Sequence, residues 1–259
     1  MKFGIICTRN TPKTENFSRL LAENYGATRV LTHTDAASSD VLVVLGGDGS
    51  MLRAVRNFYE CGVPFYGINC GTIGFLLNEF NEIENMVDAV TTGVPLEINP
   101  MAAEIIDETG LKYEDIFINE ICLFRGVFRP CSIDLKINSR ERIKNYSGDG
   151  ILVSTAIGST AYNSSVGGII VPPKTHCLSV AAINPNGKCC FRNAIVDDSS
   201  FFEFRTNNSS DKVVNAFVDG REYKNVSQLR LWSDRQRTIE LIFNSHLSLE
   251  EKILNRQFQ

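Results

Sequence analysis

Three glycines surround a single aspartate in the segment Gly46-Gly47-Asp48-Gly49, which directly follows the apolar run Val41–Leu45. Glycine lets the backbone turn sharply and lets its N–H groups approach an anion, because no Cβ stands in the way. A carboxylate beside bound phosphate is electrostatically unfavourable unless it performs chemistry, such as accepting a proton from an attacking hydroxyl. We therefore predict that Asp48 is a general base on a phosphate loop. The alternative is a turn in which aspartate and glycine only satisfy backbone geometry.

The residues after this loop predict a helix whose N-terminus supports the same site. Ser50 is the expected N-cap, and the helix dipole favours phosphate at that end. Arg53 lies one turn further on, where it either reaches the phosphate or belongs to a solvated helix face. The loop is not a P-loop, because Gly-Lys-Ser/Thr is missing, and Leu52 stands where a Rossmann fingerprint needs its third glycine.

A second polar site, Asn119-Glu120, stands between the apolar runs Ile116–Ile118 and Ile121–Phe124. Polar side chains placed in this way can bind ribose hydroxyls and the edge of a base. The alternative for these two residues is a buried structural pair. The pair therefore predicts a ligand contact only in combination with other motifs.

The third candidate site begins at Asp149, which lies between two glycines, and continues through the segment Gly158–Ser165. Hydroxyl residues beside glycine make a polar surface close to the backbone. Tyr162 can stack against an adenine, and the hydroxyls can bind its ring nitrogens. The alternative is a glycine-rich loop that caps a helix.

Strand and helix patterns alternate in the first third of the chain. The expected strands are apolar runs, and the expected helices are apolar stripes at helical spacing. The expected strands are Phe3–Cys7, Val41–Leu45 and Val63–Ile68. The first helix stripe is Phe17, Leu20, Leu21 and Tyr25, with the helix ending at Gly26, and the second is Met51, Leu52, Val55, Phe58 and Tyr59. The third is Ile83, Met86, Val87 and Val90, with Asn81 as the expected N-cap. This alternation predicts a doubly wound α/β domain.

Strand patterns dominate after Pro95, so we expect a β-rich second domain, a β-sandwich, with the boundary near residue 96. Val213–Val218 and Glu222–Val226 predict a hairpin, and we expect Asp219-Gly220 to be only its tight turn. Thr238–Phe243 predicts one more strand, before a weak helix over 247–254. The expected domains are residues 1–96 with 238–259, and residues 97–237.

The composition excludes several classes of protein. Of the 259 residues 43% are apolar, so folding needs no disulfide or metal. A formal net charge of −4 without basic runs argues against nucleic acid or a membrane as partner. There is no signal-peptide pattern, and no apolar run reaches the roughly 20 residues of a membrane span. We therefore expect a cytoplasmic protein.

The eight cysteines do not show metal-binding spacing. No two are separated by two residues, Cys189 and Cys190 are adjacent, and the three histidines lack a second ligand at metal spacing. Cys7, Cys122 and Cys177 have apolar neighbours, so we expect buried thiols in a reduced protein. We therefore expect that the protein itself holds no metal.

Four motifs in this order resemble those of the NAD kinases, and the similarity runs from Phe3 to Arg221. They are the GGDG loop at 46–49, a second glycine-rich loop Gly67–Leu76, the pair Asn119-Glu120, and Asp149 followed by Gly158–Ser165. The resemblance implies transfer of the terminal phosphate of ATP to the 2′-hydroxyl of the adenosine ribose of NAD, which gives NADP. It also implies a site between the two domains, a last strand that returns to the first domain, Mg²⁺ or another divalent cation carried with ATP, and a homodimer or homotetramer.

The resemblance further implies a role for individual residues. Asp48 would be the catalytic base, and the phosphate loop would consist of Gly46, Gly47 and Gly49. The residues implied to bind NAD are Asp48, Gly49, Arg53, Asn119, Glu120, Asp149, Thr160, Ala161, Tyr162, Asn163, Ser164, Ser165 and Ala181. Within this set the resemblance implies that Thr160–Ser165 cradle the adenosine and that Arg53 contacts phosphate.

Three features depart from the family pattern. Ser147 stands where many members have a basic residue, Arg221 stands where many have glutamine, and Asn184–Arg192 matches nothing typical. These departures concern the outer contacts of the dinucleotide.

Two other functions remain open. A lipid kinase of the diacylglycerol or sphingosine type shares the GGDG loop, but it needs an apolar cleft, whereas Gly158–Ser165 is polar. A non-catalytic NAD sensor would not need the carboxylate of Asp48, because binding phosphate does not require one.

Overall fold

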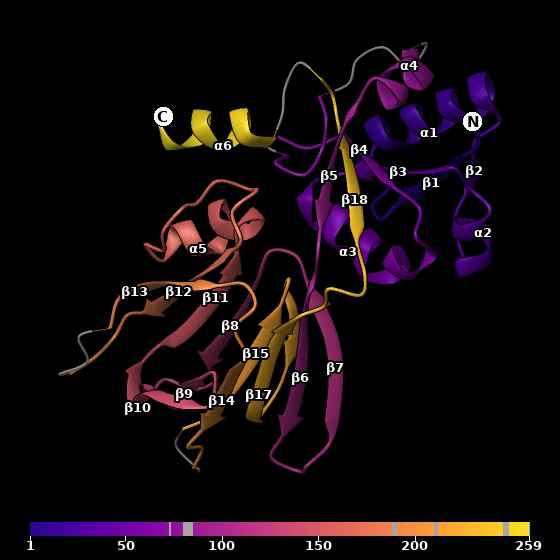
Figure 1. Ribbon diagram of the computed structural model, residues 1–259. Coiled ribbons are helices and arrows are strands. Elements are labelled where there is room, and N and C mark those ends of the chain that lie inside the picture. The colour runs from indigo at the N-terminus through magenta and orange to yellow at the C-terminus, as the bar shows by residue number, and fades with distance from the viewer. Residues whose placement is uncertain (73, 80–84, 188–190, 210–211, 246–248, 259) are drawn as a thin grey trace. The chain divides into compact units, whose positions relative to one another are not determined.

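Two structural units divide the chain in the computed structural model (Figure 1). Unit 1 consists of Met1–Asn99 and Gln236–Gln259, and unit 2 of Pro100–Arg235. The structure describes residues 1–72, 74–79, 85–187, 191–209, 212–245 and 249–258, with only the backbone of residue 256. The expected Asn81 cap, Ile83 of the third helix stripe, and the adjacent Cys189 and Cys190 lie outside the described residues.

Unit 1 is built on a six-stranded sheet in the order β2-β1-β3-β4-β18-β5. Its strands are β1 (Phe3–Cys7), β2 (Thr28–Arg29), β3 (Val41–Gly46), β4 (Phe65–Asn69), β5 (Val94–Ile98) and β18 (Ile239–Phe243). Neighbouring strands are parallel, except β18 and β5, which are antiparallel. The run Val41–Leu45 is buried throughout, as a strand covered on both faces requires.

Unit 1 also contains several helices, some of which cover the two faces of this sheet. They are α1 (Pro12–Tyr25), α2 (His33–Ala37), α3 (Asp48–Phe58), the 3₁₀ turn η1 (Tyr59–Cys61), α4 (Met86–Thr91) and α6 (Leu249–Gln257). Leu21 of α1 and Met86 of α4 share a core with Val43 of β3. On the opposite face α3 packs closely, since a Cβ added to Gly67 would lie 2.7 Å from the terminal methyl of Met51. The expected doubly wound α/β fold is confirmed.

Local features of unit 1 partly follow the sequence patterns. α1 ends at Gly26, whose φ of 62° lies in the left-handed region that favours glycine. Val87 is 40% exposed, so the buried stripe of α4 is narrower than expected. Cys122 and Cys177 are buried as expected, but Cys7 is only half-buried because it is the last residue of β1.

The start of α3 differs from the sequence prediction. Gly47 is the N-cap and Asp48 is the first helical residue, so the expectation that Ser50 caps this helix is wrong. The extended backbone of Gly47 (φ −121°, ψ −175°) begins the helix earlier than the apolar stripe suggests. The Ser50 hydroxyl instead lies 2.7 Å from the hydroxyl of Thr8 at the end of β1.

The last strand returns to unit 1, as expected. In Figure 1 the yellow strand β18 lies between the purple strands β4 and β5. Leu241 and Phe243 are buried in the sheet, and Tyr66 donates its hydroxyl to Asn244 Oδ1 at 2.5 Å. Unit 1 is therefore completed by residues that follow unit 2 in the sequence.

Unit 2 contains two six-stranded antiparallel sheets, in the orders β10-β9-β14-β17-β6-β7 and β13-β12-β11-β8-β15-β16. The first consists of β6 (Met101–Asp107), β7 (Lys112–Phe117), β9 (Cys131–Ile137), β10 (Arg140–Gly148), β14 (Phe202–Thr206) and β17 (Val226–Ser233). The second consists of β8 (Glu120–Arg125), β11 (Gly150–Thr155), β12 (Cys177–Ile183), β13 (Asn193–Asp197), β15 (Val214–Val218) and β16 (Arg221–Tyr223). A short turn and helix, η3 (Ile157–Thr160) and α5 (Tyr162–Ser165), follow β11.

One apolar core joins the two sheets of unit 2. Alternate residues of both sheets contribute to it, for example Ile133 and Leu135 of β9 and Ile151 and Val153 of β11. This alternation is the pattern of a strand with one face toward the core. The expected β-rich second domain is thus confirmed.

Candidate active site

The glycine loop joins β3 to α3 at the carboxyl end of a parallel strand, where α/β sheets bind ligands. A Cβ added to Gly46 would collide with the Ser50 side chain, so packing inside the protein requires this glycine. Apart from the adjacent residues and the backbone of α3 itself, a Cβ added to Gly47 or Gly49 would meet no described atom within 4 Å. These two glycines therefore leave open space beside the first amides of α3, which lack partners within the helix and can face an anion.

Asp48 points its carboxylate at the second glycine-rich loop. Its Oδ2 accepts the backbone N–H of Phe75 at 3.1 Å, and its Oδ1 accepts that of Leu76 at 2.8 Å. Burial raises the pKa of Asp48, whereas these two amides and the charge of Lys252 oppose the rise. The two amides thus hold the carboxylate in one orientation and, with Lys252, favour its ionised form.

The loop that holds Asp48 is itself fastened to neighbouring strands. The Cys70 N–H donates to the Gly46 carbonyl at 2.7 Å, and the Asn69 N–H donates to the Asn78 carbonyl at 2.9 Å. The Asn69 side chain accepts the Gly71 N–H at 2.9 Å and donates to Glu79 at 2.6 Å. Ile73 of the expected loop motif lies outside the described residues.

Arg53 is exposed on α3, and its guanidinium donates to the Thr8 hydroxyl at 3.1 Å. The same hydroxyl lies 2.7 Å from that of Ser50, so Arg53 is held at the carboxyl end of β1. The arrangement places a positive charge beside the first turn of α3, where it can contact phosphate.

In unit 2, Asn119 and Glu120 lie where β7 turns into β8, and the turn residue Asp219 holds this segment. Asp219 accepts the backbone N–H groups of Ile118, Asn119 and Glu120 at 2.9, 3.1 and 3.0 Å. Asp219 and Gly220 form the expected hairpin turn, with φ of 44° and 82°. The three contacts of the Asp219 carboxylate were not expected, because nothing local in the sequence links residues 118–120 to residue 219.

Glu120 has an unusual electrostatic environment. Burial and the negative charge of Asp219 raise the pKa of Glu120 to about 8, while the backbone amide of Tyr162 opposes the rise. The atoms Glu120 Oε2, Asn119 Oδ1 and Asn163 Oδ1 are buried, and within the described part of the chain they have no hydrogen-bond partner. Unpaired buried polar atoms cost free energy, so a ligand that supplies hydroxyls or amines here would relieve that cost.

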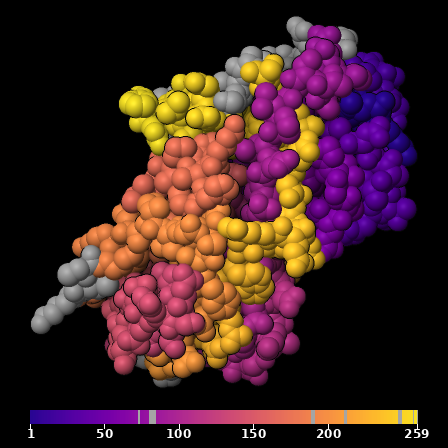
Figure 2. Space-filling view, in the orientation of Figure 1, coloured from indigo at the N-terminus to yellow at the C-terminus, as the bar shows by residue number. Residues whose placement is uncertain are grey.

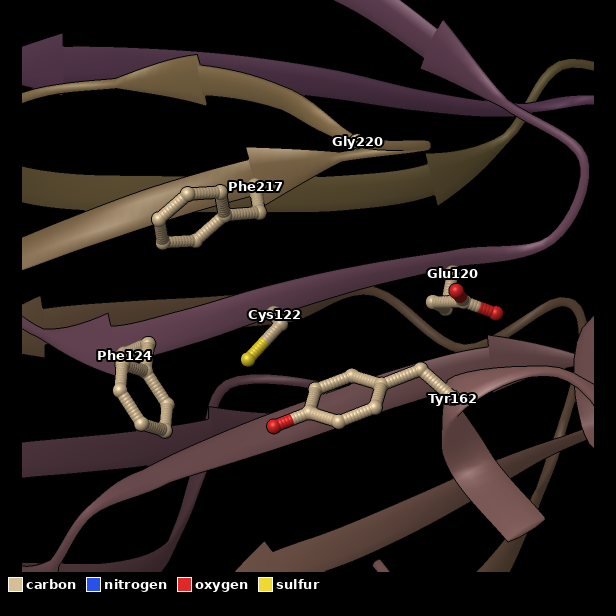
Figure 3. Close-up of a pocket in the computed structure, with 6 residues that line it drawn as sticks. All are labelled: Glu120, Cys122, Phe124, Tyr162, Phe217 and Gly220. Atoms are coloured by element: carbon tan, nitrogen blue, oxygen red, sulfur yellow. The ribbon is translucent and has the colours of Figure 1, made fainter. Parts of the chain in front are cut away.

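A cavity of about 340 Å³ lies beside Glu120 in unit 2. Its lining residues are Glu120, Cys122, Phe124, Tyr162, Phe217 and Gly220 (Figure 3). Figure 3 shows the ring of Tyr162 lying below Cys122, with Glu120 at one end of the ring and Phe124 at the other. The size and the mixture of aromatic and polar walls suit a planar ring joined to a polar group.

The segment Gly158–Ser165 uses several of its polar groups internally. The Ser164 hydroxyl donates to the carbonyls of Thr160 and Ala161, and the Asn163 amide donates to the carbonyls of Ser159 and Ile169. Tyr162 and Ser165 are exposed, and Thr160 is buried. The structure therefore makes the segment a rigid turn that presents Tyr162 to the cavity.

Asp149 precedes β11, its charge acts on Tyr162 of the cavity wall, and its carboxylate is bound by two side chains. Arg125 Nε is 2.5 Å from its Oδ1, and Asn184 Nδ2 donates to its Oδ2 at 2.8 Å. Arg125 also donates to the carbonyls of Val127 and Phe128. Arg125 thus supplies positive charge to Asp149, which sequence reasoning did not foresee.

The remaining residues that the sequence singled out have structural partners. Ala181 is fully buried in β12, opposite Leu152 of β11. The Ser147 carbonyl accepts the Asn186 N–H at 2.7 Å. The guanidinium of Arg221 lies 5.3 Å from the ring centre of Tyr223.

Unit 1 therefore gathers the glycine loop and Asp48, and unit 2 gathers Asn119, Glu120 and Tyr162. Sequence reasoning missed Phe124 and Gly220 as lining residues, and it also missed Cys122 and Phe217. The last two are directly opposite each other on β8 and β15, so the alternation of those strands would have placed them on one face if the pairing had been known.

Comparison with known protein families covers both units. Residues 3–94 match the model of the ATP-NAD kinase N-terminal domain, and residues 118–238 match that of the ATP-NAD kinase C-terminal domain. The chain is 32% identical over 235 residues to the NAD kinase of Rickettsia bellii, which covers 89% of this chain and 90% of that protein.

Solved structures share the fold at lower identity. Yeast NADH kinase complexed with NADH superposes with a TM-score of 0.83 at 18% identity, over all of this chain and 87% of that one. An NAD kinase from Archaeoglobus fulgidus in complex with ATP gives a TM-score of 0.79 at 19% identity, over 99% and 98% of the two chains. Among the described residues, no helix is long and apolar enough to cross a membrane.

Proposed function

Since the chain belongs to the NAD kinase family, a family of phosphotransferases, we propose that it transfers the terminal phosphate of ATP to the 2′-hydroxyl of the adenosine ribose of NAD, with Asp48 as the base. The observation that carries this proposal is the carboxylate of Asp48, fixed by two amides at the end of β3 beside a glycine loop with open space. The product of the reaction would be NADP.

The chemistry requires mainly positioning and the removal of one proton. Phosphoryl transfer offers the protein little covalent chemistry, so catalysis depends on orientation and on electrostatic stabilisation. As the 2′-oxygen bonds to phosphorus, its proton passes to Asp48, and the bond between phosphorus and the bridging oxygen of ADP breaks. The first amides of α3 and the guanidinium of Arg53 are suited to bind phosphate oxygens.

We propose that unit 2 recognises the NAD. Its support is the cluster of unpaired buried oxygens at Asn119, Glu120 and Asn163 beside the exposed ring of Tyr162. The carboxyl and amide groups would bind ribose hydroxyls and a base edge, and Tyr162 would stack on a ring. Thr160, Ala161, Ser164 and Ser165, on the same turn, would frame the adenosine, and Asp149 would make an outer contact. Ala181 is fully buried, so it would contribute to the site only through the packing of β12.

The proposal includes Mg²⁺ carried with ATP. In the described residues no three acidic, histidine or cysteine side chains cluster as a metal cage, and Mg²⁺ bound to nucleotide phosphates needs none. When bound, the ion neutralises phosphate charge. EDTA is therefore expected to abolish NADP formation, and added MgCl₂ to restore it.

We also propose a homodimer or homotetramer located in the cytoplasm. The location is supported by the free thiols of the described cysteines Cys7, Cys61, Cys70, Cys122, Cys131 and Cys177, which suit a reducing compartment. Light scattering coupled to gel filtration measures the assembly. A monomer at micromolar concentration would contradict the proposed oligomer.

The substitution Asp48→Asn tests the assigned base. It keeps the shape of the side chain but removes the proton acceptor, so we expect kcat for NADP formation to fall about 10²- to 10⁴-fold. NAD should still bind, as calorimetry measures, because Asn119, Glu120 and Tyr162 of unit 2 are proposed to hold the dinucleotide. Asp88→Asn is the matched control, because Asp88 is an exposed aspartate on α4 in the same unit. Near-normal turnover of Asp48→Asn would refute the role of Asp48.

The two alternative functions are not favoured. A lipid kinase does not explain why both halves of the chain match the ATP-NAD kinase domains. A non-catalytic sensor does not explain a carboxylate that two amides orient beside the glycine loop.

A further inference from the structure

The C-terminal helix α6 places a lysine against the loop that holds Asp48. Lys252 Nζ donates to the Gly74 carbonyl at 3.1 Å and also to the Leu77 carbonyl. The same ammonium lies 5.5 Å from the ring centre of Phe243, the last residue of β18. Lys252 is half-buried, whereas Glu250 on the same helix is exposed, and α6 forms the yellow surface at the upper left of Figure 2.

The carbonyls that Lys252 binds lie on either side of the amides that hold Asp48. Gly74 precedes Phe75 and Leu77 follows Leu76 in the chain. The Gly74 carbonyl and the Phe75 N–H belong to one planar peptide group, so an ammonium that fixes the carbonyl also fixes the direction of the N–H. That N–H donates to Asp48 Oδ2 at 3.1 Å.

Charge couples the same groups. Among the described residues, Lys252 is the charged group that acts on Asp48, and it favours the ionised carboxylate. The charges that act on Lys252 are Asp48 and Glu79, and they oppose the effect of burial, which lowers the pKa of Lys252. Burial of Asp48 alone would favour the protonated acid, which cannot accept the hydroxyl proton.

We propose that Lys252 is a positioning residue for phosphoryl transfer, which fixes the Gly74–Leu77 loop so that the amides of Phe75 and Leu76 aim an ionised Asp48 at the acceptor hydroxyl. The inference rests on the proposed role of Asp48 as base. It adds to that proposal a residue from the opposite end of the chain, on a helix that lies outside both matched family domains.

The substitution Lys252→Met tests the inference through the pH dependence of kcat for NADP formation. Activity requires ionised Asp48, so kcat falls at low pH as the carboxylate is protonated. Without the lysine charge the pKa of Asp48 rises, and the acidic limb of the profile should therefore move to higher pH. We also expect the maximal kcat to fall about 10- to 100-fold, because without Lys252 the loop amides no longer hold Asp48 in the productive orientation. The KM for NAD should stay within about twofold, because Lys252 is assigned no contact with NAD.

Two further variants separate the charge of Lys252 from its shape and from its helix. Lys252→Arg keeps the positive charge but cannot match the ammonium at both carbonyls, so its acidic limb should stay in place while kcat falls. Glu250→Gln changes an exposed charge on the same helix and should change neither quantity. An acidic limb that is unmoved in Lys252→Met would overturn the inference.

A second measurement does not depend on catalysis. Amide hydrogen exchange at Phe75 and Leu76 should accelerate in Lys252→Met and not in Glu250→Gln, because the loop loses its anchor. Unchanged exchange at both amides would overturn the inference even if Lys252→Met were inactive. A failure of the proposed role of Asp48 would be recognised by a different result. In that case Asp48→Asn would retain turnover, whatever the effect of Lys252→Met.

Discussion

Asp48 and Glu120 are both carboxyl groups that the fold removes from water, but their surroundings act on them differently. Asp48 receives two backbone amides and the charge of Lys252, all of which favour its ionised form. Glu120 receives one amide and faces the negative charge of Asp219. The surroundings of Asp48 therefore favour its ionised form, which a base needs, whereas a pKa of about 8 leaves Glu120 mostly protonated at neutral pH.

The raised pKa of Glu120 predicts a dependence of stability on pH. The pKa is about 8 in the folded protein against an ordinary value of 4.5, so between these values the folded state holds a proton that the unfolded state has lost. This contribution is complete below pH 4.5 and is lost as pH rises to about 8, by up to about 1.4 kcal/mol per pH unit. Glu120→Gln lacks this effect, so its free energy of unfolding should increase relative to that of the wild type as the pH rises.

Denaturant unfolding from pH 5 to pH 9 measures this difference. The control is Glu141→Gln, which changes an exposed glutamate of β10 in the same unit and should leave the pH dependence of the wild type intact. Parallel stability curves for Glu120→Gln and the wild type would show that Glu120 is ionised in the folded protein at neutral pH.

At the scale of elements, the junction between β3 and α3 contains two kinds of glycine. One kind is needed for packing within the fold, and the other is explained only by a bound ligand. Gly46 is required because a Cβ there would collide with Ser50. Gly49 is an exposed residue in the first turn of α3, and a Cβ there would meet open space. Helix propensity favours alanine over glycine, so the fold alone gives no reason for Gly49.

The substitution Gly49→Ala should therefore stabilise the protein and impair the enzyme. We expect the free energy of unfolding to rise by about 0.5–1 kcal/mol through helix propensity. The added methyl occupies the space proposed for nucleotide, so we expect kcat/KM for ATP or for NAD to fall about tenfold, which corresponds to about 1.4 kcal/mol. Thermal unfolding and NADP-formation kinetics give the two quantities.

Gly46→Ala is the matched comparison in the same loop. It should lower the free energy of unfolding by about 1–3 kcal/mol, because overpacking against Ser50 forces the loop to shift. If Gly49→Ala were more stable and retained the kinetics of the wild type, the open space beside the loop would not be a nucleotide site.

At the scale of the whole molecule, the two units differ in how the chain builds them. Unit 2 is one continuous segment, Pro100–Arg235, with its own core between two sheets. Unit 1 needs residues from both sides of unit 2, because β18 pairs with β4 and β5. β5 lies at the edge of the sheet next to β18, so among the described strands it would have no partner without β18.

This difference predicts the behaviour of truncated chains. A fragment of residues 100–235 should unfold cooperatively on its own, whereas a chain that ends at residue 235 should expose unit 1 to protease while unit 2 stays resistant. A chain that ends at residue 245 keeps β18 but lacks α6, so it should retain a protected unit 1 and have low turnover. Limited proteolysis with mass spectrometry compares the three. Equal protection of unit 1 in both truncated chains would contradict the role of β18.

Local patterns were sufficient to predict the kinds of element and the position of the glycine loop. The run Val41–Leu45, the glycine loop after it and the stripe of the next helix each depend on residues close in sequence, and the structure follows them from β3 into α3. The pattern of apolar residues also distinguished an α/β part from a β-rich part. Parallel strands that are buried on both faces are continuous apolar runs, whereas antiparallel strands with one face toward the core alternate apolar and polar residues. Local reasoning failed at Ser50, since the cap depends on the backbone conformation of Gly47 and not on residue type alone.

The surroundings of the chemical groups were decided only by the tertiary structure. Asp48 is oriented by Phe75 and Leu76, whose loop is anchored by Lys252, and Asp219 holds a segment about one hundred residues away. Such contacts leave no periodic signal, because their spacing in sequence depends on how strands are ordered in a sheet. The sequence alone thus determined which residue types could perform the reaction, and the fold decided their orientation, burial and charge.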